Sequence, residues 1–200
     1  NTEFSYILKS RYRMSLLASY TRHPITKSYM AEENKRILVL PMNLSSDYSA
    51  GIRLSAANQK PFPWWQINTN LLLTYRKYAW QMDGDEYRNK KFTPMLYIGH
   101  QLHLPQGWTA ELNGYWNGKT PQGQAIISPT WSVSGGISKS MFGDRGTLRL
   151  FAENLFSSRH IHIDVFSTTQ QGWYKEKMRM KLGVGFSFRF HKGETPKEFT

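Results

Sequence analysis

Residues 174–190 carry the sequence YKEKMRMKLGVGFSFRF, in which apolar and polar side chains alternate. Every second position from Met178 to Phe190 is apolar, and the positions between them hold cationic or small residues. Because successive side chains of a β-strand point to opposite faces of a sheet, this pattern predicts a strand with one apolar face. The alternation holds for about thirteen residues, more than the roughly nine to eleven that a tilted strand needs to cross a bilayer. We therefore expect a membrane-crossing strand whose lipid-facing residues are Met178, Met180, Leu182, Val184, Phe186 and Phe188.

The composition of the whole chain restricts the class of protein. The 200 residues suffice for one domain with a sizeable core, and the lack of cysteine excludes disulfides and thiolate metal sites. No stretch approaches the roughly eighteen consecutive apolar residues of a transmembrane helix. The low mean hydropathy is compatible with a membrane barrel, because half of each strand faces a polar lumen.

The net charge of +12 raises the question of a nucleic-acid partner. Lys and Arg are dispersed along the expected strands and turns, and no basic segment gathers them. We therefore expect no nucleic-acid binding and interpret the excess charge as a cationic lumen and rim of a barrel.

The same alternation recurs along the chain and predicts about nine antiparallel strands. The expected strands span residues 2–8, 12–29, 37–56, 64–78, 91–104, 108–116, 126–141, 147–156 and 174–190. Pro41 and Asn43 predict a kink or bulge within the third of them. We find no helical periodicity of useful length, so the sequence predicts an all-β fold.

The connections between these strands alternate in length. Short turns are expected at residues 59–63, 105–107 and 142–146, and longer polar loops at residues 31–35, 81–90, 117–125 and 157–173. Bacterial barrels have short periplasmic turns and long extracellular loops, whereas a soluble sandwich has no reason to collect its long loops at one end. Aromatic residues beside both sets of connections match the two aromatic belts of a membrane barrel, with ordinary core aromatics as the alternative. We therefore expect an antiparallel transmembrane β-barrel, and a soluble β-sandwich is the alternative fold.

The N-terminal sequence predicts a fragment or a processed product. It has neither the basic nor the apolar region of a signal peptide and opens directly into an alternating run from Phe4 to Leu8. Single-chain bacterial barrels have an even number of strands, and an open sheet edge in hydrocarbon leaves backbone groups unpaired. We therefore expect at least one further strand upstream. Residues 1–190 are expected to form the C-terminal portion of a larger barrel, and residues 191–200 a polar tail.

Several short motifs stand out by their order and spacing: LLASYTR at 16–22, EYRNKKF at 86–92, LPQGW at 104–108, ELNGYW at 111–116, GGISKS at 135–140 and LFAENLF at 150–156. Together they resemble the C-terminal part of the outer-membrane β-barrel family within the TonB-dependent receptor superfamily of Bacteroidetes. The resemblance implies about nine C-terminal strands of a barrel of about 22 strands with an N-terminal plug. It also implies an integral, multi-pass protein of the bacterial outer membrane that imports a large nutrient, such as a glycan, a peptide or a metal chelate.

The resemblance further implies a set of partners. These are outer-membrane lipids and lipopolysaccharide, the N-terminal barrel strands and plug, the barrel-assembly machinery, the TonB complex and a surface lipoprotein. Gly185, Phe186, Phe188 and Phe190 look like the C-terminal signal that the barrel-assembly machinery reads. The alternative function is a structural barrel that holds partner proteins at the outer membrane without transport.

Cationic side chains are expected to line the lumen: Arg13, Arg53, Arg76, Arg149, Arg179 and Lys181. In a plugged barrel such residues would pair with plug carboxylates, and a path or site for an anionic substrate is the other interpretation. Ligand or partner contacts are expected in the long loops, above all in residues 81–90 and 157–173.

Catalytic and metal chemistry find little support in the sequence. His160, His162 and Asp164 share one face of an alternating segment, and their side chains are competent metal ligands. Polar residues at every second position are, however, expected on any lumen-facing or loop strand. We find no arrangement of a nucleophile, a base and an orienting group. We therefore expect a protein that is not an enzyme, with no catalytic residue, no cofactor and no metal site.

Overall fold

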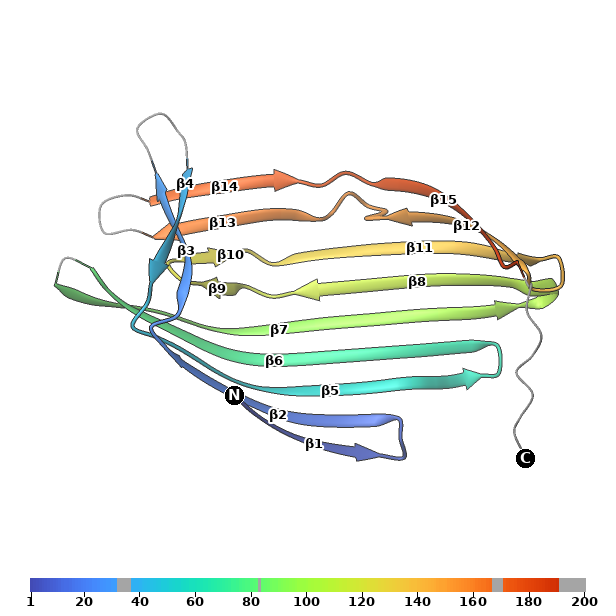
Figure 1. Cartoon of the computed structure of the whole chain (residues 1–200), viewed down its shortest axis with the longest axis horizontal. Helices are drawn as coiled ribbons and strands as arrows, with labels where there is room; N and C mark the ends of the chain where they lie inside the picture. The colour runs from blue at the N-terminus through green and yellow to red at the C-terminus, as the bar shows by residue number, and fades with distance from the viewer. Residues whose placement is uncertain (32–36, 83, 167–170, 191–200) are drawn as a thin grey trace.

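The chain folds almost entirely into antiparallel β-strands in a computed structural model that describes residues 1–31, 37–82, 84–166 and 171–190. A nine-stranded sheet forms the main body (Figure 1). Its strands, in sheet order, are β1 (Thr2–Leu8), β2 (Tyr12–Arg22), β5 (Ser46–Phe62), β6 (Trp65–Met82), β7 (Asp85–Leu104), β8 (Trp108–Asn117), β11 (Thr130–Met141), β12 (Gly146–Glu153) and β15 (Lys181–Phe188). All neighbours pair antiparallel, so the predicted fold, about nine antiparallel strands of a barrel wall, is confirmed.

The strand registers place alternate residues on two chemically different faces. One face, called the outer face, carries paired apolar residues on the last two strands: Leu182 with Ala152, Val184 with Leu150, and Phe186 with Leu148. The opposite face, called the inner face, carries Arg149, Phe151 and Glu153 of β12. The alternation in the sequence predicts this division between the two faces.

The outer face is mainly apolar, and many of its large side chains are exposed. Leu182 and Val184 at one edge of the sheet are 74% and 72% exposed, and Phe4 at the other edge is 67% exposed. A soluble sandwich would bury one face of each sheet against the other. In the described part of the chain the buried apolar side chains are few, and they lie near one end of the sheet. This distribution favours a barrel wall over the sandwich.

Connections of different length gather at opposite ends of the sheet, as predicted (Figure 1). Short turns at one end, called the turn end, join β1 to β2, β5 to β6, β7 to β8 and β11 to β12. The turn between β7 and β8 contains the 3₁₀ helix η1 (Pro105–Gly107). No helix within the described residues is long and apolar enough to span a bilayer.

The opposite end, called the loop end, carries further strands. A ribbon is formed by β3 (Ile25–Ala31) and β4 (Ile37–Asn43). A four-stranded sheet contains, in order, β14 (Gln171–Lys177), β13 (His160–Phe166), β10 (Ala125–Ile127) and β9 (Thr120–Gln122).

The loop end is more regular than the sequence predicts. The expected loop at 81–90 is the continuation of the β6–β7 ladder, which extends to the pair of Met82 with Asp85. The expected loops at 117–125 and 157–173 contribute strands to the four-stranded sheet. The tip at 31–35 lies almost wholly, and the tail at 191–200 wholly, outside the described residues.

Two expected strands divide where the β3–β4 ribbon leaves the main sheet. The strands are interrupted at residues 23–24, between β2 and β3, and at residues 44–45, between β4 and β5. Pro41 and Asn43 lie within β4. Two backbone bonds close the neck of the ribbon, since the His23 N–H donates to the Ser45 carbonyl and the Leu44 N–H donates to the Pro24 carbonyl. The kink predicted at Pro41 and Asn43 therefore occurs a few residues later, at residues 44–45.

The stretch 174–190 is not one strand. β14 ends at Lys177 and β15 begins at Lys181. Met178, in the interruption, lines a pocket on the inner face, which corrects its expected lipid-facing position. Met180 also lies in the interruption, where its backbone N–H donates to the Ser157 hydroxyl at 3.1 Å, and its side chain is 43% exposed.

Candidate functional site

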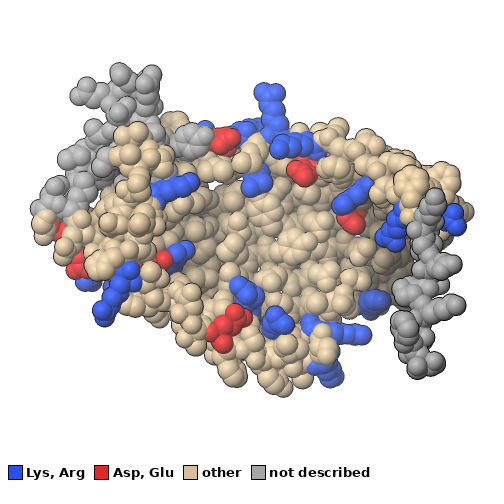
Figure 2. Space-filling model, viewed as in Figure 1, with Lys and Arg blue, Asp and Glu red and all other residues tan. Residues whose placement is uncertain are grey.

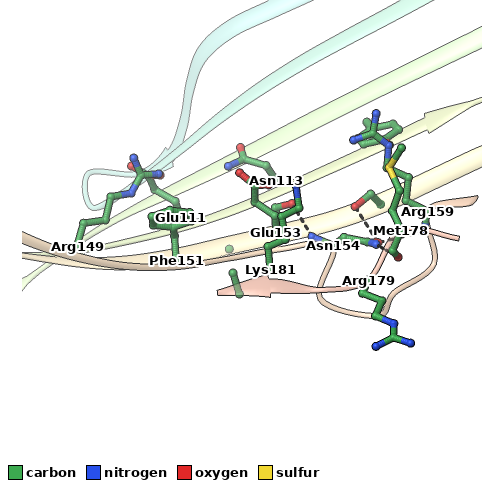
Figure 3. Close-up of a pocket in the computed structure, with 15 residues that line it drawn as sticks. Glu111, Asn113, Arg149, Phe151, Glu153, Asn154, Arg159, Met178, Arg179 and Lys181 are labelled. Carbon is green, nitrogen blue, oxygen red and sulfur yellow. Dashed lines mark hydrogen bonds and ion pairs between the residues drawn. The ribbon is translucent and has the colours of Figure 1, made fainter. Parts of the chain in front are cut away.

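A pocket of about 370 Å³ opens on the inner face at the side of β15. Its lining comes from β8, β11, β12, the first residue of β15, and the segments that precede β13 and follow β14 (Figure 3). These neighbouring strands bring together side chains that alternate with the apolar outer face. Figure 2 shows a hollowed face of the molecule, with basic and acidic side chains distributed around the hollow.

An ion pair forms one wall of the pocket. The Arg149 guanidinium donates to the Glu111 carboxylate, with 2.7 Å between Nη2 and Oε2. The Arg149 guanidinium carbon also lies 5.8 Å from the centre of the Phe151 ring. The Arg149 side chain is exposed and the Glu111 side chain is partly exposed, so solvent screens the pair and its contribution to stability is small. Its effect is to hold the guanidinium in a defined place beside an aromatic surface.

Asn154 fixes the other wall of the pocket. Its backbone lies in the left-handed region with φ of 54°, which Asn tolerates better than most residues. The side-chain amide donates to the Met178 carbonyl at 2.7 Å, and the amide oxygen accepts from the backbone N–H of Arg159 at 3.0 Å. Asn154 is 6% exposed. The bond to Met178 gives a physical reason why the strand is interrupted at 178–180, where the sequence itself still alternates.

A close contact between β12 and β15 lies beside the pocket. A Cβ atom placed on Gly183 would lie 2.2 Å from the Phe151 ring, so only glycine leaves room for this ring. The ring covers the Gly183 backbone from the inner face, in the manner by which aromatic side chains protect glycines in sheets.

The remaining cations of the pocket are less tightly held. The Arg159 guanidinium carbon lies 5.8 Å from the centre of the Tyr115 ring. Lys181 lies opposite Glu153 in the β12–β15 register but has no carboxylate oxygen within 4.0 Å among the described residues. Arg179 borders the pocket, but its guanidinium points away from it (Figure 3).

The structure does not bring all the predicted lumen residues together. Arg149, Arg179 and Lys181 border the pocket, whereas Arg13, Arg53 and Arg76 lie on β2, β5 and β6. Arg76 forms its own ion pair with Asp47, with 2.9 Å between Nε and Oδ1. Within the described ranges, Arg13 and Arg53 have no ion pair. Sequence reasoning did not identify Arg159, Asn113 and Tyr115 as pocket residues, although the alternation on β8 places the last two on the inner face.

The candidate metal ligands on β13 have separate partners. The His162 ring bonds the Asp164 carboxylate at 3.0 Å and stacks on Trp173. The Nδ1 atom of His160 instead lies 2.8 Å from the Ser158 carbonyl. Across the described residues, no group of three or more His, Cys, Asp or Glu side chains has an arrangement that could hold a metal ion.

A small apolar cluster holds the loop end together. Leu44, Tyr78 and Trp80 are buried there, and the Asn89 amide donates to the carbonyls of Gly123 and Ala125. Burial raises the pKa of the Tyr78 hydroxyl to about 12. The cluster packs the β6–β7 projection against Leu44 and Met42 at the end of β4, and the Asn89 bonds fasten the projection to the segment that carries β9 and β10.

The arrangement of the pocket suits binding. It combines cations, aromatic rings and amide groups, which together recognise a solute or a protein segment that carries anionic and hydrogen-bonding groups. The carboxylates of Glu111 and Glu153 add acceptors on the same wall.

The comparisons with known proteins agree with this architecture. Residues 1–190 match the outer membrane protein beta-barrel family. No curated protein and no solved structure matches the chain. The match covers all the described residues, and the nine-stranded antiparallel sheet with its apolar outer face is the structure expected of such a protein. The chain belongs to the outer membrane protein beta-barrel family.

Proposed function

We propose that this chain forms part of the wall of a TonB-dependent receptor in the bacterial outer membrane, which imports a large nutrient without chemical conversion. The observation that carries the proposal is the inner-face pocket, where fixed and unpaired cations lie beside aromatic rings. This combination of cations and aromatic rings on the inner face supports contact with a passing solute over a barrel that only holds partner proteins.

The chemistry of the inner face supports an anionic group as part of the transported solute. Lys181 has no carboxylate partner among the described residues, and Arg13 and Arg53 have none either. Arg149 keeps donor groups beyond the one that contacts Glu111. In the receptor these cations face either the carboxylates of a plug or the passing solute. In the proposed import, the cations first pair with the carboxylates of the plug. When the plug is displaced, the same cations become accessible to the anionic groups of the solute.

The same proposal includes partners that lie outside this chain. A plug and further strands close the barrel, the TonB complex supplies energy, and a surface lipoprotein delivers the nutrient. Gly185, Phe186, Phe188 and Phe190 serve as the signal for the barrel-assembly machinery. Phe188 packs edge-on against Phe142 and Phe190, with ring centres 5.9 and 4.9 Å apart, so the end of β15 presents an ordered aromatic group.

An uptake experiment tests the proposal. Cells with and without the gene are given fluorescently labelled oligosaccharides, peptides and metal chelates, each in an anionic and a neutral form. We expect one anionic class to enter only cells that carry the gene, and its entry to stop when the proton-motive force is dissipated. Normal uptake of every class without the gene, while partner proteins are lost from the outer membrane, would contradict import and favour the scaffolding barrel.

A pair of variants connects the uptake to the pocket. Arg149→Gln removes the fixed guanidinium, and Lys139→Gln, at the turn end of the outer face, removes a cation that does not border the pocket. We expect uptake to fall in the first variant and to stay unchanged in the second. If uptake by Arg149→Gln stays as high as uptake by Lys139→Gln, the pocket does not contact the solute.

A further inference from the structure

Four cations lie in consecutive cross-strand rows on the outer face near the loop end. One row, from β2 to β7, contains Tyr20, Tyr48, Lys77 and Lys90. The next row toward the loop end contains Arg22, Ser46, Ala79 and Arg88. We call Arg22, Lys77, Arg88 and Lys90 the basic belt. All four side chains are exposed or half-buried.

The height of the basic belt can be estimated from the geometry of β6. From Trp65, at the turn end, to Tyr75 the outer-face residues of this strand are apolar apart from Thr69. These are about ten residue steps, or about 33 Å of strand, at about 3.3 Å per residue. A tilt of about 40° reduces this length to a height of about 25 Å, which equals the apolar band of membrane barrels. Lys77 therefore lies about 5 Å beyond the apolar band, at the depth of lipid headgroups.

The two lysines of the belt directly face each other. Lys77 and Lys90 are cross-strand partners on β6 and β7, and like charges in this position repel. Neither lysine has a carboxylate oxygen within 4.0 Å among the described residues. Cross-strand Cβ atoms lie about 5 Å apart, so both ammonium groups can reach one anion. An anion between them would convert a repulsive pair into a favourable one.

The acidic side chain of the outer-face row next to the belt, within the described residues, is already engaged. The Glu86 carboxylate accepts two bonds from Arg88, at 2.9 and 3.0 Å. This contact, and to a smaller extent the charge of Lys77, lower the pKa of Glu86. On this part of the described outer face, one carboxylate therefore offsets only one of four positive charges. The remaining positive charge is available to bind an external anion.

The surroundings of the belt indicate which anion it accepts. Immediately toward the membrane lies a row with Tyr75 and Phe92, which are 38% and 57% exposed, and below it lies the apolar outer face. A free phosphate would contact only the cations of the basic belt. A lipid contacts the basic belt with its phosphate and the apolar residues below the belt with its acyl chains.

We propose that the basic belt is a binding site for the phosphate groups of an outer-leaflet lipid, with one phosphate held between Lys77 and Lys90. Arg22 and Arg88 flank this position and give the site a width of four strands. The proposal concerns the outer face and is independent of the import proposed for the inner face.

The test uses the full-length protein in nanodiscs of neutral lipid. Lipid A with both phosphates and lipid A without phosphates are added, and native mass spectrometry counts the lipids bound to each protein. We expect the phosphorylated form to bind preferentially. The double variant K77Q/K90Q should bind it about tenfold less well, because two charge-assisted contacts are lost.

Matched variants separate this site from general effects of charge. Lys91→Gln removes a neighbouring cation of β7 that lies opposite Arg76 on the inner face, and binding should not change. K77R/K90R keeps both charges and should keep binding. Each variant is compared only if its migration on gels still shifts on heating, as that of the unmodified protein does.

Three results would overturn the proposal. These are equal binding of the two forms of lipid A, unchanged binding by K77Q/K90Q, and equal losses in K77Q/K90Q and Lys91→Gln. Complete displacement of lipid A by millimolar inorganic phosphate would assign the belt to free phosphate instead.

Discussion

Asn154 shows how one side chain determines the shape of the wall next to it. Its amide joins the end of β12 to the Met178 carbonyl and the Arg159 amide, two points that are far apart in sequence. The Ser132 and Ser158 hydroxyls also approach its amide oxygen, at 3.3 and 3.4 Å. Asn154 therefore holds the four-stranded sheet and the start of β15 in fixed relation to the wall.

Replacement of this residue should be costly. We expect Asn154→Ala to lower the free energy of unfolding by about 2–3 kcal/mol, because buried backbone groups lose their partners and the left-handed backbone disfavours alanine. Urea unfolding of the full-length protein in detergent, followed by tryptophan fluorescence, measures the change. Asn154→Gly loses the same bonds without the backbone strain and should be less destabilised by about 1 kcal/mol. A change below about 0.5 kcal/mol in the alanine variant would contradict the role of the amide.

The division of β15 into two faces gives a second prediction. Val184→Arg puts a charge on the outer face in the middle of β15 and should lower the free energy of unfolding by about 2–4 kcal/mol. Ser187→Arg, on the inner face of the same strand, should be tolerated far better. Unfolding from lipid bilayers measures both variants. Equal losses would show that the two faces have been assigned wrongly.

The sequence is informative about such residues only where the strand is continuous. The face of Val184 follows from alternation alone, since each neighbour on β15 keeps the period of two. The face of Met178 does not, because its sequence neighbours still alternate through the interruption at 178–180. A contact from a distant residue, Asn154, accompanies the interruption. Local periodicity carries no information about such a contact.

At the scale of elements, the pairing of β12 with β15 depends on the fit of Phe151 over Gly183. We expect Gly183→Ala to destabilise the protein by about 1–2 kcal/mol, because the new methyl group displaces the ring. Phe151→Ala should make the same substitution nearly neutral. A double-mutant cycle of unfolding free energies measures this coupling. Additive effects would show that the ring does not determine the need for glycine.

The strands of the main sheet were predictable, whereas those of the loop end were predictable only in part: β3 and β4 lie largely within expected strands, but β9 and β13 lie in expected loops. Strands such as β8 have clean alternation with large apolar residues, which directly indicates two different environments. At the loop end both faces of a strand are polar or mixed, as in β13, where alternation suggested a loop strand or a metal site. The pairing of β13 with β10 and β14 rests on partners that are remote in sequence, so local composition could not predict it.

At the scale of the whole molecule, the sheet has two edges that need partners. In the described sheet β1 and β15 each pair along one side only. Unpaired backbone groups in hydrocarbon cost several kcal/mol each, so an isolated open sheet is unstable in a membrane. We expect residues 1–200, refolded alone in detergent, to form assemblies of several chains. Analytical ultracentrifugation with density matching measures the mass, and a stable, protease-resistant monomer would contradict this expectation.

The order of strands in the main sheet also bears on how quickly the wall can form. Each strand pairs with the strand that precedes or follows it in the main sheet, and several pairs are joined by turns of a few residues. Loops of this length close within nanoseconds to microseconds, and topologies rich in local contacts fold fast. The wall can therefore grow hairpin by hairpin, without a search by distant segments for each other. Only the seam that closes a barrel joins strands from opposite ends of the sheet, so closure of the seam, rather than growth of the wall, should limit the rate of assembly.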